Sequence, residues 1–73
     1  MTLLNGKIGN SYIVKELSVE GNAAKRLQAL GLITGTKVSI LNAKKNGAVI
    51  FKVRGTRLAV GRKIAESIHV TED

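Results

Sequence analysis

The side chains that could carry acid–base or metal-binding chemistry are few, and most of them lie near the end of the chain. There is one histidine, His69, and three of the five carboxylates, Glu66, Glu72 and Asp73, lie within four residues of it. Together they could form a weak, exposed metal site. A structural or catalytic transition-metal site usually needs about three or four protein ligands, and His69 is expected to point outward from a short strand. We therefore expect no metal or other cofactor, with direct binding of a transition metal ion as an alternative.

The remaining nucleophilic side chains are not arranged for catalysis. The chain has no cysteine, and its four serines have no evident base to activate them. Gly55 and Gly61 lie among basic residues, but without the spacing of a phosphate-binding loop. The sequence therefore predicts a protein that is not an enzyme.

The charge balance indicates an anionic partner. Twelve lysines and arginines against five acidic residues give a net charge of +7, which favours nucleic acid, an acidic protein face or the inner membrane surface. Proteins that bind single-stranded nucleic acid stack the bases on aromatic side chains, but Tyr12 and Phe51 are the only aromatics here, and Phe51 is assigned to the core. A dedicated nucleic-acid module is therefore the less favoured alternative.

A short helix and two glycine turns dominate the first half of the chain. Asn22 is the expected N-cap of the helix. Gly31 stands where a left-handed C-cap is needed, and Leu32 can then fold back onto the helix. Thr34–Gly35 fits the centre of a type II turn, whose second central residue needs a positive φ. The chain therefore reverses direction by a defined route.

The strands alternate in hydrophobicity and are separated by turn residues. The β-branched segment 11–17 is expected to be the first strand. Asn46–Gly47 predicts a two-residue type I′ turn that joins a strand over 36–45 to one over 48–54. This turn would place Ile40 opposite Val53.

A second turn, predicted as type II′ at Gly55–Thr56, would place Val53 opposite Leu58. The two turns are independent, yet both put the same alternate side chains on one face of the three-stranded sheet, and this agreement is how register is specified. The predicted inward residues are Val38, Ile40, Val49, Phe51, Val53, Leu58 and Val60.

The opposite face of this sheet combines an apolar spot, Leu41 and Ile50, with three basic residues, Lys52, Arg54 and Arg57. An apolar centre with a charged rim is typical of a protein-recognition surface, so these five residues form the candidate protein-binding site. The alternative is that N-terminal residues cover the apolar spot and the charges are simply solvated.

The predicted elements describe one small β domain over residues 1–73. A helical turn over 62–67 and a last strand over 68–70 follow the three-stranded sheet, with Ile68 and Val70 inward. A mainly β chain with one short helix after the first strand and a helical turn before the last strand is typical of a small SH3-like β-barrel. No secretory or membrane-spanning segment is evident, so a cytoplasmic protein is expected.

Two runs of residues resemble the FeoA family. Residues 26–38 read RLQALGLITGTKV, and residues 58–70 read LAVGRKIAESIHV. Thr34 stands where the family commonly has proline. The resemblance implies an SH3-like barrel that acts as a small accessory protein of bacterial ferrous iron uptake and docks on the FeoB transporter or its cytoplasmic GTP-binding domain. It also makes ferrous iron the ion to consider for direct binding.

Overall fold

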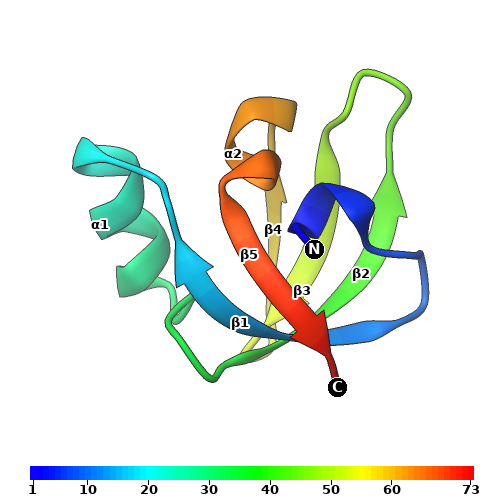
Figure 1. Cartoon of the computed structure of the whole chain (residues 1–73), viewed down its shortest axis with the longest axis horizontal. Helices are drawn as coiled ribbons and strands as arrows, with labels where there is room; N and C mark the ends of the chain where they lie inside the picture. The colour runs from blue at the N-terminus through cyan, green and yellow to red at the C-terminus, as the bar shows by residue number, and fades with distance from the viewer.

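The computed structural model of the whole chain contains one antiparallel sheet of five strands in the order β4-β3-β2-β1-β5 (Figure 1). The strands are β1 (Ser11–Leu17), β2 (Lys37–Ala43), β3 (Val49–Val53), β4 (Thr56–Val60) and β5 (Ile68–Glu72). The helical elements are a 3-10 turn η1 (Leu3–Asn5), the helix α1 (Gly21–Ala29) and the short helix α2 (Arg62–Glu66). The predicted element order, with a helix after the first strand and a helical turn before the last, is confirmed. Neither helix is long and apolar enough to cross a membrane.

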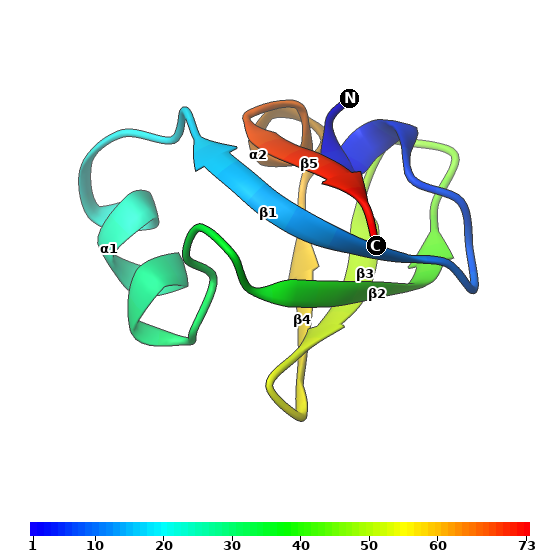
Figure 2. The ribbon, with the colours of Figure 1, turned by 60° about the horizontal axis from the view of Figure 1, so that its bottom comes forward.

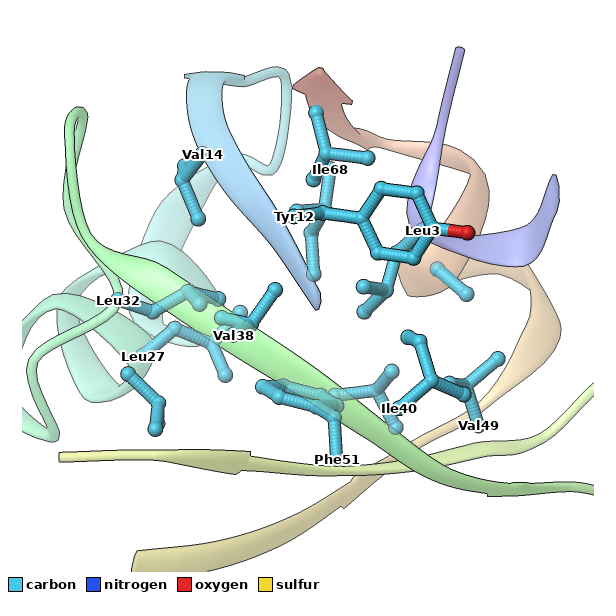
Figure 3. Packing of buried hydrophobic residues seen from close by; sticks show 14 residues of the cluster. Leu3, Tyr12, Val14, Leu27, Leu32, Val38, Ile40, Val49, Phe51 and Ile68 are labelled. Carbon is cyan, nitrogen blue, oxygen red and sulfur yellow. The ribbon is translucent and has the colours of Figure 1, made fainter. Parts of the chain in front are cut away.

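The sheet is strongly coiled, so that β1 and β5 pass across β3 and β4 (Figures 1 and 2). Side chains from both halves meet between them: in Figure 3, Tyr12 and Ile68 lie on one side of the core and Phe51 on the other. All fourteen buried residues are hydrophobic. Six of the seven predicted inward residues belong to this core, and the seventh, Leu58, is half-buried and packs against it.

The end of α1 has the predicted geometry. Gly31 has a φ of +100°, the Gly31 N–H donates to the carbonyl of Gln28, and the Leu32 N–H donates to the carbonyl of Leu27, both at 3.0 Å. These two bonds define the Schellman motif, in which the residue after the glycine packs back on the last turn. Leu32 is accordingly buried beside Leu27 in the core.

The turn that follows is also confirmed. Gly35 has a φ of +91°, and the Thr36 N–H donates to the Ile33 carbonyl at 3.0 Å, as a type II turn over these four residues requires. The Gly35 N–H donates to the carbonyl of Val14 at 2.7 Å. The turn is therefore tied to β1.

The start of α1 differs from the prediction. The helix begins at Gly21, with Glu20 at the N-cap position and no side-chain hydrogen bond to the helix end, so Asn22 lies inside the helix. Gly21 has a φ of +68°. Because only glycine adopts this conformation readily, the change of direction occurs one residue before Asn22. The assignment of Asn22 as N-cap was wrong.

The loop between β2 and β3 has three residues and not two. The Gly47 N–H donates to the Lys44 carbonyl at 3.0 Å, and the Lys44 N–H donates to the Ala48 carbonyl at 2.8 Å. Gly47 has a φ of +94°, whereas Asn46 is not among the positive-φ residues. A type I′ turn needs a positive φ at both central residues, so this loop is instead a turn followed by a left-handed glycine.

This extra loop residue changes the register of β2 against β3. Ile40 pairs with Phe51 and not with Val53, and a bulge between Ile40 and Asn42 leaves Leu41 as the extra residue. The loop and the bulge each shift the pairing by one residue. Because side chains alternate with a period of two, the combined shift of two leaves the predicted inward side chains facing inward.

The β3–β4 turn lies one residue earlier than predicted. Arg54 and Gly55 are its central residues, with φ values of 50° and 80°, and they are flanked by the paired residues Val53 and Thr56. Two positive φ angles define a type I′ turn, so the type II′ turn at Gly55–Thr56 was wrong. Phe51, not Val53, pairs with Leu58. This shift is again two residues, and the inward face is unchanged.

Thr34 provides a test of the type II turn. Proline suits the first central position of this turn, and no backbone hydrogen bond of the Thr34 N–H is present to be lost. The Thr34 hydroxyl, however, donates to the Lys15 carbonyl at 3.2 Å, and proline would remove this bond. We therefore expect Thr34→Pro to be more stable than Thr34→Ala, which also lacks the hydroxyl, by about 0.4–1 kcal/mol. Urea unfolding of both variants measures the difference, and a less stable proline variant would contradict the turn assignment.

Candidate docking surface

The outer face of β3 and β4 carries two like charges directly opposite each other. Lys52 and Arg57 are cross-strand partners, and both are exposed. The ion pairs of the protein lie elsewhere, between Lys37 and Asp73 and between Arg62 and Glu66. Like charges that face each other across a sheet destabilise it. No acidic side chain of the protein forms an ion pair with Lys52 or Arg57.

The side chain of Arg54 packs against the protein, unlike those of Lys52 and Arg57. This residue occupies the β3–β4 turn, and a Cβ atom added to Gly31 would lie 2.6 Å from Arg54 Cδ. The stem of Arg54 thus rests on the end of α1, where carbonyl groups favour a nearby positive charge. A φ of 50° is unfavourable for a residue with a side chain. The structure brings Lys52 and Arg57 together but packs Arg54 against the helix end.

The apolar part of the predicted surface is only partly open. Leu41, the extra residue of the bulge, is 42% exposed, whereas Ile50 is half-buried. The N-terminal segment does not cover Leu41. It instead contacts the neighbouring Ile40, whose carbonyl accepts a hydrogen bond from the Gly9 N–H at 2.9 Å. Leu41 is therefore available to a partner.

The predicted metal-binding side chains are not brought together. Glu66 pairs with Arg62 at 3.3 Å and Asp73 pairs with Lys37 at 3.0 Å, while the half-buried His69 lies opposite Glu16 on β1. No three histidine, cysteine or acidic side chains gather where they could hold a metal ion.

Both aromatic side chains are enclosed in the core. Tyr12 is 2% exposed and Phe51 is fully buried. The Tyr12 hydroxyl accepts a hydrogen bond from the Lys7 N–H at 2.8 Å. The surface therefore offers no aromatic platform for stacking of bases.

Sequence reasoning missed an apolar groove between α1, β4 and α2. Leu27 and Leu30 are spaced as on one face of a helix, but only Leu27 is buried, and Leu30 is 44% exposed. The distance between the helix and the sheet depends on tertiary packing. The helical periodicity of the sequence therefore could not predict a groove between them. Its lining residues are Ala23, Arg26, Leu27, Leu30, Leu58, Ala59, Val60, Gly61 and Ile64.

Comparison with known proteins identifies the family. The model of the FeoA domain matches residues 1–72. The chain belongs to the FeoA domain family. A curated protein of Methanocaldococcus jannaschii, provisionally named Fe(2+) transport protein A, is 33% identical over 66 residues, which cover 90% of this chain and 79% of that protein.

Solved FeoA structures have the same fold. The solution structure of FeoA from Chlorobium tepidum gives a TM-score of 0.91 at 30% identity, and the match covers 99% of this chain and 70% of that chain. FeoA of Stenotrophomonas maltophilia, crystallised with zinc and described as a prokaryotic SH3 domain protein, gives a TM-score of 0.80 at 27% identity over 96% of this chain and 88% of that chain. The prediction of an SH3-like FeoA fold is confirmed.

The strained turn at Arg54 can be tested by substitution. Type I′ turns favour asparagine at the first central position, so Arg54→Asn should relieve the backbone strain and raise the free energy of unfolding by about 0.5–1 kcal/mol. Arg54→Ala is the matched control, because it also loses the stem that rests on Gly31 but keeps a side chain that disfavours positive φ. Thermal and urea unfolding measure both variants. Equal stability of the two would contradict strain at this position.

Proposed function

We propose that this chain is an accessory protein of ferrous iron uptake that acts by docking on another protein and not by catalysis. Membership of the FeoA domain family and the likeness to the Fe(2+) transport protein A of Methanocaldococcus jannaschii support the place in iron transport. His69 has one acidic cross-strand neighbour, Glu16, but no three histidine, cysteine or acidic side chains gather at one place, which supports a binding role over metal-assisted chemistry.

The observation that carries the docking proposal is the pair of exposed like charges, Lys52 and Arg57, in a sheet that also carries the exposed Leu41. Two unneutralised positive charges attract an acidic partner and orient it, while burial of an apolar side chain supplies contact energy. The proposed docking surface comprises Leu41, Ile50, Lys52, Arg54 and Arg57.

The partner we propose is the cytoplasmic GTP-binding region of a FeoB-type transporter, in accord with the family resemblance. The protein would then act in the cytoplasm and meet the membrane only through this partner. The transporter region is expected to present acidic side chains to the basic face.

Direct metal binding receives less support from the structure. The Stenotrophomonas maltophilia FeoA was crystallised with zinc, but in this chain Glu66 and Asp73 are each engaged by a basic side chain away from His69. A role in binding nucleic acid receives little support, because neither aromatic side chain is exposed for stacking of bases. Docking on a protein is therefore the better supported function.

An amide chemical-shift titration of the labelled protein with the cytoplasmic region of the FeoB-type transporter from the same organism tests the proposal. Shifts should centre on Leu41, Ile50, Lys52 and Arg57. Shifts centred on the face of α1 with Lys25, Arg26 and Gln28 would keep the partner but reject this surface. Absence of shifts with this region and with the full-length transporter in membrane would reject the partner.

Charge reversal isolates the role of the basic face. Replacing Lys52, Arg54 and Arg57 by glutamate should weaken docking by about 1–2 kcal/mol, or roughly 5- to 30-fold in Kd, and reduce its dependence on salt.

The matched control reverses three exposed lysines outside this face, Lys7, Lys44 and Lys45. It changes the net charge by the same amount, so it separates a local surface from the overall charge of the protein. Isothermal calorimetry at two salt concentrations measures both variants. An equal loss of affinity in both would show that net charge, and not this face, attracts the partner.

A further inference from the structure

The two edge strands of the sheet differ in whether another segment of the chain pairs with them. The N-terminal segment lies beside β5 (Figures 1 and 2). Thr2 forms a bridge with His69, and the Val70 N–H donates to the Met1 carbonyl at 2.9 Å. β4 is the other edge strand and pairs only with β3. An edge strand with unpaired backbone groups is a template for a further strand.

The register identifies which groups of β4 are unpaired. In a two-residue hairpin the residues that flank the loop, here Val53 and Thr56, exchange backbone hydrogen bonds, and such pairs alternate with non-bonded pairs along the ladder. Lys52–Arg57 and Ile50–Ala59 are the non-bonded pairs. Arg57 and Ala59 therefore direct their N–H and C=O groups away from β3, and no other backbone or side-chain group hydrogen-bonds to them.

The surroundings of this edge differ on its two sides. On the inner side is the apolar groove beside α1, lined among others by Leu30, Leu58 and Ile64. On the outer side is the Lys52–Arg57 pair. Because successive side chains of a strand point to opposite faces, a segment added to β4 would place alternate residues in the groove and on the basic face.

We propose that the free edge of β4 binds an extended segment of a partner protein in which apolar and acidic residues alternate. The segment extends the sheet as a sixth strand, antiparallel to β4, and hydrogen-bonds to the outward backbone groups of Arg57 and Ala59. Its apolar side chains enter the groove, and its acidic side chains neutralise Lys52 and Arg57. This is binding by β-strand addition, in which backbone bonds supply affinity and side chains supply specificity.

Charge decides the occupant. A second copy of this chain paired through β4 would place the Arg57 side chains of both copies on one face of the joined sheet, in two chains that each carry a net charge of +7. Like charges on such a face repel. An acidic segment would be attracted and not repelled, because it brings negative charges to the same positions.

The inference goes beyond the proposed function, since it concerns the mode of binding and holds for any partner with such a segment. It is tested with a synthetic probe and not with the transporter. A failure here would therefore leave the transporter proposal intact, and a failure of the transporter titration would leave this one intact.

The probe is a capped peptide of alternating valine and glutamate that matches β4 in length, added to the labelled whole chain. The amides of Arg57 and Ala59 should shift and become protected from hydrogen exchange. The amides of Leu58 and Val60, which already face β3, should gain no comparable protection. No change at Arg57 and Ala59 at millimolar peptide would overturn the proposal.

Two modified peptides test the pairing itself. A glutamate opposite Arg57 or Ala59 directs its own N–H toward β4, whereas the valine N–H groups point away. N-methylation of the glutamates should therefore weaken binding about tenfold through lost hydrogen bonds, and N-methylation of the valines should have little effect. Equal binding of the two would show that the peptide does not pair as a strand. A lysine–valine peptide that binds as well as the glutamate peptide would overturn the role of charge.

A pair of protein variants tests the groove. Leu30→Ser removes an exposed apolar side chain that lines the groove, and Ile8→Ser removes an exposed apolar side chain outside it. Leu30→Ser should weaken peptide binding several-fold and Ile8→Ser should leave it unchanged. Equal affinities would overturn the groove assignment. Concentration-dependent shifts at Arg57 and Ala59 without peptide would identify a second copy as the occupant and overturn the proposal.

Discussion

A single coiled sheet has to enclose its own apolar face, and the other features of the protein follow from this requirement. With no cysteine in the chain, there is no disulfide to compensate for a loosely packed interior, and a domain of this size buries only about 60% of the surface that its unfolded chain exposes. The fourteen buried side chains are all hydrophobic. Most come from the strands, which leaves α1 outside this enclosure, attached mainly through Leu27 and the Schellman turn that buries Leu32. The strands bury most of the core by themselves, so only part of the apolar face of α1 packs against the sheet. The apolar groove is the space left beside it.

Two features of the β3–β4 hairpin are locally unfavourable. Arg54 adopts a left-handed conformation that asparagine or glycine would adopt more easily, and Lys52 faces Arg57 with no acidic group between them. Local conflicts of this kind are expected at functional sites, where a requirement other than stability selects the residues. Their concentration in a single hairpin is why we propose the docking surface there and not at the basic loop with Lys44 and Lys45.

The sequence predicted which side chains face the core better than it predicted how the strands pair. Both hairpin turns were placed wrongly. The β3–β4 error shifted the pairing by two residues, and in the β2–β3 hairpin the longer loop and the bulge at Leu41 together shifted Ile40 by two. A shift of two preserves the face. The loop before Gly47 depends on whether Asn46 takes a positive φ, and the bulge at Leu41 depends on strand curvature; neither has a clear signal in a single sequence. For the site, alternation predicted that Lys52 and Arg57 share a face, but the predicted turn would have placed Arg57 opposite Arg54 and not opposite Lys52. The groove could not, because it depends on the distance between α1 and β4, elements separated by two strands.

Arg57 links the two binding modes. Its side chain belongs to the basic face, and its backbone N–H and C=O belong to the free edge of β4. A partner that presents a folded acidic surface would use the first, and a partner that presents an extended acidic segment would use both at once. The two edges of the sheet therefore differ: the N-terminal segment pairs with β5, and we propose that a partner extends the sheet at β4. Substitutions at Arg57 would change both modes, so their effects are not additive with those of other surface residues. Only modification of the peptide backbone, which leaves every side chain in place, separates strand addition from attraction of charge.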